Sequence, residues 1–361
     1  MSELIKAHIP YGTPAWYKYR ETGIGGSDVG AILGQSDYTS LARMFYEKIG
    51  EIPPRFYDNA AMYWGRKTEP LILDVWSYWD GTDYIGNPKQ REYYQNEFYA
   101  RNPKFDHLFG ETDGMISKGQ ANLITGELLK RDGVLEAKTI NGWFAKKWEL
   151  GVPKTYISQI NTYMLIFDAD YAEIAILADG RDFNVIPFEK NKALCDKILD
   201  ETFKFWYEKV VPAKEFVINK NKAISKGDAV AADEYTHMIH ELEPGADASD
   251  DYSKFASDLF QGGEDVFFGT EVEYNLAAGD KILNAYISAL KTKKKLIENK
   301  FREIFKNENV SEIEFDQGKV KYFKKKGSDN LQVGNYIKTV VDKDIVDTNL
   351  TIMFRQTDLN I

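Results

Sequence analysis

The sequence is poor in the residues that build disulfide and thiolate-metal sites. It has one cysteine, Cys195, and four histidines. A single cysteine excludes internal disulfides and cysteine-rich metal or iron–sulfur centres, and so few histidines give zinc chemistry little support. The phosphate-loop pattern GxxxxGK[ST] is also absent, so we expect no nucleotide-driven motor. A reducing cytoplasm is the compartment that this composition favours.

Long apolar runs and an excess of basic residues are missing as well. No stretch of about 18 apolar residues occurs, so we expect no membrane-spanning helix. The N-terminus, MSELIKAHIPYGTPAW, has no basic start followed by an apolar core, and we expect no signal peptide. The formal net charge of −10 argues mildly against non-specific nucleic-acid binding. A local basic groove remains compatible with it, because net charge averages over the whole surface.

The chain does have enough apolar residues for sizeable cores. Apolar residues make up 43% of its 361 residues, and aromatic residues make up 14%. This length favours two domains. We predict an α/β domain at 1–215, with a central mixed β-sheet flanked by helices. An acidic linker region at 216–278 follows, and then an α+β C-terminal extension at 279–361, with a long amphipathic helix at 279–306 and a small β-rich tail. The elements expected in the first domain are helices at 40–50, from about Pro70, at 155–168 and at 189–210, and strands at 92–100, 107–116, 123–129, 133–139, 171–177 and 183–188.

Three residues form the most informative pattern in the chain. Asp113 stands in GETDG, and Glu136 and Lys138 close the apolar run GVLEAK. Side chains alternate along a strand, so Glu136 and Lys138 share one face. A short hairpin between the two segments would bring Asp113 to them. Two carboxylates beside an ammonium can hold a divalent metal next to a phosphodiester. The competing interpretation is a surface Glu/Lys pair and a separate Asp-Gly turn.

Two further polar residues are candidates for the same site. Glu69, in WGRKTEP, is either a third acid or a helix N-terminal carboxylate that complements the macrodipole. Gln159 and Tyr163 lie four residues apart on one predicted helix face. Gln159 either hydrogen-bonds to Lys138 or a phosphate, or simply belongs to a polar helix surface.

A glycine-rich loop offers a possible phosphate contact. Gly25 and Gly26 precede Ser27 and Asp28 at the start of a predicted helix, where free backbone N–H groups can bind an anion. Ser27 is the better phosphate contact because Asp28 would repel an anion, and Arg20 can supply positive charge. Helix N-capping by Ser27 or Asp28 is the alternative.

Six short motifs, taken in order, resemble those of the YqaJ-like phage recombinases, which are similar to the lambda-type exonuclease within the PD-(D/E)xK nuclease superfamily. The resemblance covers roughly residues 14–210. One position departs from it, since the family's Pro-Asp-Gly is Thr112-Asp113-Gly114 here. The motifs are Trp16-x-x-x-Arg20, GIGGSDVGAILG, Trp64-Gly65-Arg66-x-x-Glu69, Asp113-Gly114, Glu136-Ala137-Lys138 and Pro153-x-x-Tyr156-x-x-Gln159.

The resemblance implies a restriction-endonuclease-like core and an Mg²⁺- or Mn²⁺-dependent exonuclease that digests one strand of linear duplex DNA from 5′ to 3′. It implies that Asp113, Glu136 and the Ala137 carbonyl bind the metal and that Lys138 serves the attacking water. Glu69 and Gln159 would support the site, with Glu69 also a metal ligand. Arg20 and Ser27 match positions that contact a terminal 5′-phosphate. The resemblance also implies DNA ends and a single-strand annealing protein as partners, and a ring-shaped homotrimer.

Two other functions remain open from the residues. A structure-specific DNA endonuclease can use the same core, and it would cut a closed circular duplex. A non-catalytic DNA-binding module on a nuclease fold is the third possibility, against which the complete set of acids and lysine argues.

Overall fold

The computed structural model describes residues 4–36, 38–54, 59–81, 89–148, 151–259, 269–315, 318–325 and 328–332. The chain divides into two compact units, Met1–Gln261 and Gly262–Ile361. Among the described residues, no helix combines the length and the apolar composition that crossing a membrane requires.

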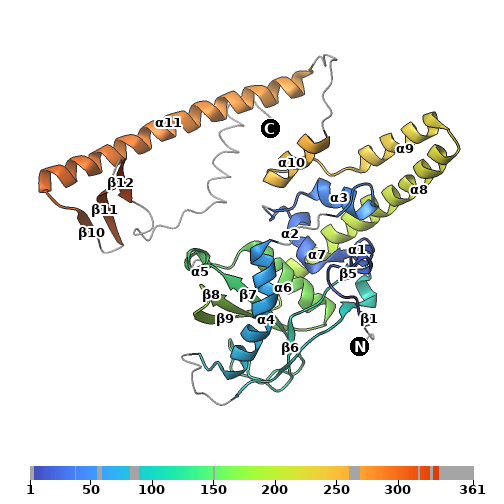
Figure 1. The fold of residues 1–361 in the computed structure, drawn as a ribbon, viewed down its shortest axis with the longest axis horizontal. Coiled ribbons are helices and arrows are strands. Elements are labelled where there is room, and N and C mark those ends of the chain that lie inside the picture. Colours follow the sequence, from blue (N-terminus) through green and yellow to red (C-terminus); the bar gives the residue numbers. More distant parts are fainter. Residues whose placement is uncertain are drawn as a thin grey trace. The chain divides into compact units, whose positions relative to one another are not determined.

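A five-stranded mixed sheet is the centre of the first unit, and it confirms the predicted α/β class with a central mixed sheet flanked by helices (Figure 1). Its order is β3-β6-β7-β8-β9, and only the β7–β8 pair is parallel. The strands are β3 (Tyr93–Tyr94), β6 (Gly114–Ile116), β7 (Gly133–Ile140), β8 (Tyr171–Ala178) and β9 (Asp182–Glu189). Two small pairs stand apart: β1 (Ile5–Ala7) is antiparallel to β4 (Tyr99–Arg101), and β2 (Ile24–Gly25) is parallel to β5 (Leu108–Phe109).

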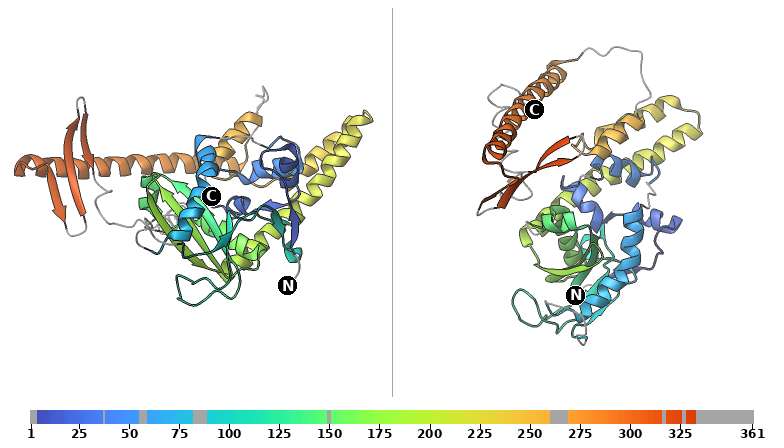
Figure 2. Two further views of the ribbon diagram at one scale, coloured as in Figure 1. Left: turned by 60° about the horizontal axis from the view of Figure 1, so that its bottom comes forward. Right: turned by 60° about the vertical axis from the view of Figure 1, so that its left-hand side comes forward.

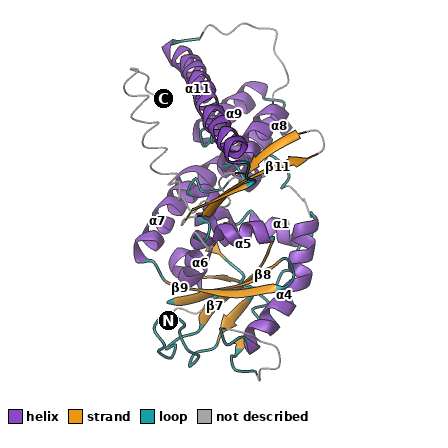
Figure 3. Cartoon of the chain, turned by 90° about the vertical axis from the view of Figure 1, so that its left-hand side faces the viewer, coloured by secondary structure: helices purple, strands orange, loops and turns teal. Residues whose placement is uncertain are grey.

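Helices cover both faces of this sheet (Figure 3). Helix α6 (Lys154–Ile166) packs with Val134 and Ile174 in one hydrophobic cluster. Helix α4 (Ala60–Tyr78) packs with Leu135 and Ala175 in another. Alternate residues of β7 therefore face two different cores, so the strand is apolar on both sides, as expected for a strand buried between two layers. The other helices before β8 are α1 (Pro14–Arg20), α2 (Val29–Ile32), α3 (Leu41–Ile49) and α5 (Gly142–Trp148). The same part of the chain contains the 3₁₀ turns η1 (Gly26–Asp28) and η2 (Pro103–Phe105).

Helix α4 begins ten residues earlier than the sequence suggests. We expected a start near Pro70, but Asn59 caps the helix by accepting a hydrogen bond from the Met62 N–H at 2.9 Å, and Pro70 lies inside it. An interior proline removes one helix hydrogen bond and usually costs about 3 kcal/mol. Burial of Leu73 and Trp76 against the sheet offsets that cost. Glu69 is therefore a mid-helix residue and not an N-terminal carboxylate.

The segment 123–129, expected as a strand, is a turn region with a single bridge between Ala121 and Leu128. Asn122 organises it, because its side chain accepts hydrogen bonds from the backbone N–H groups of Ile124, at 2.8 Å, and Thr125. An asparagine that bonds to the backbone two residues on makes a local turn and competes with strand pairing.

The acidic segment 216–278, expected as a linker, is mostly helical, and most of it packs on the first unit (Figure 2). Helix α7 (Lys192–Phe203) continues through a π-helical turn, η3 (Lys204–Val210), into α8 (Val211–Ser225). The chain therefore stays helical across the expected domain end at 215. Helix α9 (Ala229–Leu242) pairs with α8, and α10 (Asp250–Leu259) packs on α3. Their buried residues Val217, Ile239 and Phe255 join the main cluster. These few apolar residues hold the acidic helices on the rest of the first unit, so this unit ends at 261 and not at the predicted 215.

The second unit contains α11 (Glu271–Glu308) and an antiparallel sheet of β10 (Glu312–Phe315), β11 (Gly318–Lys325) and β12 (Ser328–Gln332). The described residues up to 332 contain the expected long helix followed by short strands, and the rest of the predicted tail, 333–361, lies outside the described residues. The helix is longer at its N-terminal end than expected, because Thr270 and Glu273 form a capping box.

Candidate active site

The hairpin of β6 and β7 brings Asp113 alongside Glu136. The two strands are antiparallel with Gly114 opposite Leu135, so Asp113 lies next to the middle of β7. Its Oδ2 atom accepts a hydrogen bond from the Ala137 backbone N–H at 2.7 Å. The expected grouping of these residues is thus present, and it follows from strand pairing alone.

Glu136 is the centre of the polar cluster. It forms an ion pair with Lys138 on the same face of β7, and its Oε1 also accepts a hydrogen bond from Gln159 Nε2 at 3.2 Å. Gln159 reaches it from α6 and donates as well to the Tyr163 hydroxyl, at 3.0 Å. Glu136 is only 3% exposed. Its second oxygen, Oε2, is buried without a hydrogen-bond partner.

Glu69 completes a set of three interacting carboxyl groups. Burial and then repulsion from Asp113 raise the pKa of Glu69 to about 7. The same two causes raise the pKa of Glu136 to about 8, and burial raises the pKa of Asp113. Such shifts show that the three acids are not fully compensated by their protein partners.

Lys138 is the cation that these acids share. Burial alone would lower its pKa, but attraction to Glu136 and Asp113 outweighs burial and raises it. Arg66 also lowers the pKa of Glu69, but Lys138 and Arg66 face four acids once Glu111 is included, which leaves a deficit of positive charge when all are ionised. Hard oxygen donors in such a deficit are the setting that a divalent cation such as Mg²⁺ prefers.

The residues fit a metal that keeps part of its hydration shell. The orphaned Oε2 of Glu136 is a buried acceptor that lacks a partner, and such atoms in a native fold call for an explanation. Across the described part of the chain, no three His, Cys, Asp or Glu side chains gather closely enough to ligate one ion on their own. Magnesium commonly takes one or two carboxylates and fills its other positions with water and substrate phosphate.

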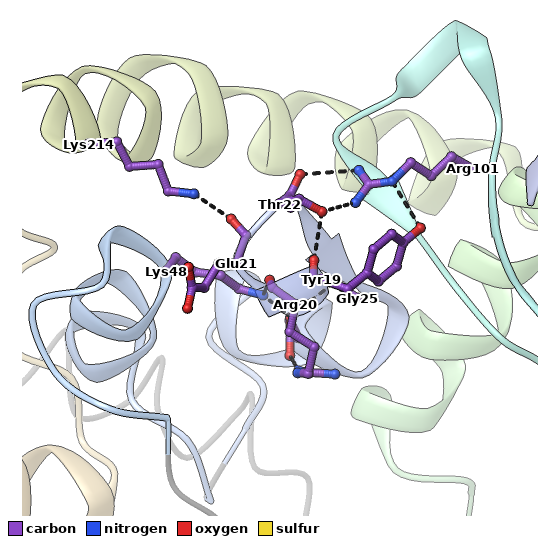
Figure 4. A network of polar contacts seen from close by, with 9 residues as sticks. Tyr19, Arg20, Glu21, Thr22, Gly25, Lys48, Arg101 and Lys214 are labelled. Atoms are coloured by element: carbon purple, nitrogen blue, oxygen red, sulfur yellow. Dashed lines mark hydrogen bonds and ion pairs between the residues drawn. The ribbon is translucent and has the colours of Figure 1, made fainter. Parts of the chain in front are cut away.

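Arg20, Gly25 and Lys48 belong to a second polar cluster (Figure 4), in which two cations bind Asp28. Asp28 pairs with Arg20 and with Lys48 Nζ, at 2.8 Å in the latter case, and accepts from the Gly25 N–H at 3.0 Å. Burial would raise the pKa of Asp28, but the two cations together hold it well below its usual range. Asp28 therefore repels an anion less than its charge suggests, and one positive charge is left over.

Ser27 lies exposed at the start of the short helical turn η1, beside this cluster. The segment that carries Arg20 and Ser27 is anchored from three directions (Figure 4). Lys48 Nζ donates to the Arg20 carbonyl at 2.7 Å, Arg101 donates to the Thr22 carbonyl at 3.2 Å, and Lys214 donates to the Glu21 carbonyl.

Tyr163 joins the two clusters physically. A Cβ atom on Gly26 would collide with the Tyr163 ring, so only glycine lets the loop approach the tyrosine this closely. The hydroxyl of the same tyrosine accepts from Gln159, which in turn bonds to Glu136. The structure thereby brings Arg20, Ser27, Glu69, Asp113, Glu136, Lys138 and Gln159 into two connected groups.

Two charged residues of these groups, Lys48 and Glu111, are not predicted from the sequence. Lys48 occupies the last turn of α3, where a lysine ordinarily complements the helix dipole, and nothing in the sequence marks it as buried. Burial lowers its pKa to about 8. Glu111 lies two residues before Asp113; burial raises its pKa, and its charge helps to raise that of Glu69. Its position in GETDG was the available signal.

Comparison with known proteins finds a similar family for part of the chain. Residues 15–171 match the model of the YqaJ-like viral recombinase domain. The uncharacterized protein YqaJ of Bacillus subtilis (strain 168) is 24% identical over 213 residues, which are 58% of this chain and 60% of the relative. The chain thus matches less than two thirds of that relative's length.

Solved structures show more distant similarity. An alkaline exonuclease, LHK-Exo, from Laribacter hongkongensis has a TM-score of 0.46 and 20% identity, over 59% of this chain and all of that one. A phage related exonuclease from Haemophilus somnus 129PT has a TM-score of 0.35 and 14% identity, over 52% of this chain and 93% of that one. The matched residues 15–171 include every site residue discussed above except Lys214, so the part of the chain that carries both polar clusters is similar to the YqaJ-like viral recombinase domain.

Proposed function

We propose that this protein is a metal-dependent DNA exonuclease of phage-type homologous recombination, which digests one strand of linear duplex DNA from 5′ to 3′. The observation that carries the proposal is the buried, incompletely bonded carboxylate of Glu136 beside Asp113 and Lys138. The similarity of residues 15–171 to the YqaJ-like viral recombinase domain supports the substrate class.

In this proposal Asp113, Glu136 and the main-chain carbonyl of Ala137 hold Mg²⁺ or Mn²⁺, with Glu69 as a supporting acid. The Ala137 N–H already holds the Asp113 carboxylate in place, so metal binding would cost this side chain little conformational entropy. A bound ion of this kind supplies an activated water and neutralises charge on the phosphate. The Glu136 Oε2 atom, which has no donor from the protein, is the natural ligand.

Lys138 and Gln159 act on the reacting groups and on Glu136. The raised pKa of Lys138 keeps it protonated, so it donates hydrogen bonds to the attacking water or to a phosphate oxygen. The Gln159 amide holds Glu136 Oε1 and thereby leaves Oε2 directed elsewhere. The aromatic ring of Tyr156 lies over the Lys138 ammonium at 5.8 Å and limits its movement.

Arg20 and Ser27 bind the terminal 5′-phosphate in this proposal, and Lys48 assists by balancing Asp28. The surplus positive charge around Asp28 and the exposed hydroxyl of Ser27 support these roles. The connection through Tyr163 and Gln159 would keep the phosphate contact at a fixed distance from the reacting centre. The proposed partners are duplex DNA ends, a single-strand annealing protein and further copies of the chain in a trimeric ring, in the host cytoplasm.

A timed digest of end-labelled linear duplex, with and without Mg²⁺, tests the proposal. We expect metal-dependent loss of the label from 5′-phosphorylated ends, slower loss from 5′-hydroxyl ends, and no cutting of closed circular duplex. Ser27→Ala should remove the preference for the phosphate, whereas Asp182→Asn, at an exposed residue remote from the two clusters in sequence, should not. Cutting of the circle would favour the endonuclease, and binding without any digestion would favour the non-catalytic module.

A further inference from the structure

Helix α11 carries an apolar stripe that no described residue of its own unit covers. The helix has 38 residues, and its buried residues are Gly279 and Phe305. The exposed large apolar side chains along it are 41–72% exposed, among them Tyr286, Leu290 and Tyr274. A long helix that is exposed on nearly every side lacks the tertiary packing from which most helical stability comes. Exposed apolar surface on this scale marks an interaction site.

The stripe repeats every seventh residue, which is the period of a coiled coil. Two series of positions, each with a spacing of seven residues, form the stripe, and one of them is apolar throughout. Together they make a seam about 50 Å long at 1.5 Å per residue. The apolar series is Leu276, Leu283, Leu290, Ile297 and Ile304; the second is Val272, Gly279, Tyr286, Lys293 and Lys300.

The strict period indicates what kind of partner covers the seam. On a straight helix a seven-residue repeat drifts by about 20° per heptad, so Ile304 would have turned roughly 80° away from Leu276. The series stays on one side only if the helix supercoils around another helix of similar length. Within the described residues the next longest helical run is the continuous α7, η3 and α8, with 34 residues (192–225), and its residues Ile198, Trp206 and Val217 are buried in the main hydrophobic cluster of the first unit. The next is α4, with 19 residues, which packs on the sheet of the first unit. Both are already packed inside the first unit, so a second copy of α11 is the partner of matching length.

The charges on α11 favour a second copy in antiparallel orientation. Its N-terminal third is acidic, with Glu271, Glu273 and Asp280. Its C-terminal half is basic, with Lys291, Lys293, Lys294, Lys295, Lys300, Arg302 and Lys306 exceeding Glu298, Glu303 and Glu308. A parallel pair would place Lys293 and Lys300 against their own copies in the seam. An antiparallel pair sets the basic half of each helix beside the acidic third of the other.

We propose that α11 forms an antiparallel two-stranded coiled coil with α11 of a second copy of this chain. This inference does not depend on the proposed nuclease activity, because it rests on the second unit alone. It also differs from a ring built by the first unit, since the contact lies between extensions.

Two matched substitutions test the contact in the full-length chain. Leu290 is 63% exposed and Leu296 is 57% exposed, but Leu296 lies about 120° around the helix from Leu290 and outside the seam. We expect Leu290→Glu to lower the particle mass by about twofold in sedimentation equilibrium, and Leu296→Glu to leave it unchanged. The chain mass is 41.4 kDa, so the two states are easily resolved. A wild-type monomer, or equal masses for wild type and Leu290→Glu, would overturn the proposal.

Cysteine cross-linking tests the orientation. Leu290 lies near the middle of the seam, so in an antiparallel pair Leu290→Cys meets its own copy and forms a disulfide on oxidation. Leu276→Cys would lie about 40 Å from its copy in that arrangement and stay unlinked. The native Cys195 is buried, so the wild type serves as the unlinked control. Cross-linking at both positions would show a parallel pair, and cross-linking at neither would exclude the contact; either result overturns the proposal.

Discussion

Two buried glutamates on neighbouring strands of one sheet have opposite surroundings. Glu136 lies on β7 and Glu173 on β8, and both are almost fully buried, at 3% and 0% exposure. The parallel register pairs Glu173 with Leu135, one position from Glu136, so the two side chains point to opposite faces of the sheet. Burying a carboxylate is costly unless donors compensate it.

Glu173 is fully compensated. Arg91 donates to both of its oxygens, at 2.8 and 2.5 Å, and its guanidinium stacks on the ring of Trp76. The Trp76 indole N–H and the Tyr171 hydroxyl each donate to it at 2.6 Å. Glu136 has an amide and a shared lysine on one oxygen and no donor on the other. The comparison indicates that the fold uses Glu173 for structure, and that it leaves Glu136 ready to bind something that the protein does not itself provide.

The largest effect expected from this comparison is on activity. Glu136→Gln should reduce DNA digestion by at least about 10⁴-fold, equivalent to about 5 kcal/mol, because a proposed metal ligand is lost. The free energy of unfolding should stay within about 1 kcal/mol of the wild type, since the substitution removes an uncompensated buried charge. Digestion assays paired with urea unfolding measure both. Retained digestion in a folded variant would disprove the role of Glu136.

Glu173→Gln should give the reverse result. Leaving Arg91 buried and unpaired should lower the free energy of unfolding by about 3–5 kcal/mol, whereas the activity of the folded fraction persists. Adding Arg91→Met should recover part of the loss, because the double variant no longer buries an unpaired charge. Urea denaturation of the single and double variants provides the measurement. A single variant as stable as the wild type would contradict the assignment of a structural role to this network.

Metal binding should separate the two glutamates by a smaller amount. At a hundredfold excess over its dissociation constant, Mg²⁺ should stabilise the wild type by about 2.7 kcal/mol, because it binds the folded state only. Glu173→Gln should keep that increment, and Glu136→Gln and Asp113→Asn should lose most of it. Thermal unfolding with and without EDTA detects the difference without relying on catalysis. Equal stabilisation of all four proteins would place the metal elsewhere.

The smallest effect is expected at His107, which is buried like Glu136 and Glu173. Its ring has a hydrogen bond but no oppositely charged group in contact. Its Nε2 lies 3.0 Å from Thr202 Oγ1, and that hydroxyl donates to the Ile198 carbonyl, so the ring nitrogen is the donor. Burial lowers the pKa of His107 to about 4 from 6.5. The unfolded chain therefore binds more protons between these values, and stability falls as the pH decreases through that window.

The expected contribution of His107 is a loss of about 2 kcal/mol between pH 7 and pH 5. The variant His107→Gln keeps a donor for Thr202 and should show a pH dependence weaker by that amount. Urea unfolding at the two pH values compares them. Identical pH profiles would mean that His107 is as well compensated as Glu173.

Local patterns predicted some elements accurately. Helix α3 follows from the Ser40 cap and from Gly50, which adopts the left-handed conformation at the C-cap. The predicted strands at 171–177 and 183–188 correspond to β8 and β9. Errors arose where distant packing overrode a local signal. Pro70 is tolerated inside α4 because the helix packs on the sheet, and the acidic α9 and α10 are held by isolated apolar contacts that average composition conceals.

The sequence by itself determined that Asp113, Glu136 and Lys138 meet, because a hairpin and strand alternation are short-range geometry. It also determined the seven-residue stripe of α11, which is a property of one helix. Only the tertiary structure decided that Gln159 reaches Glu136, that Lys48 and Arg20 share Asp28, and that Glu173 finds its donors while Glu136 Oε2 finds none. These contacts join elements far apart in the chain, and their geometry is set by how helices pack on a sheet, which residue spacing does not encode.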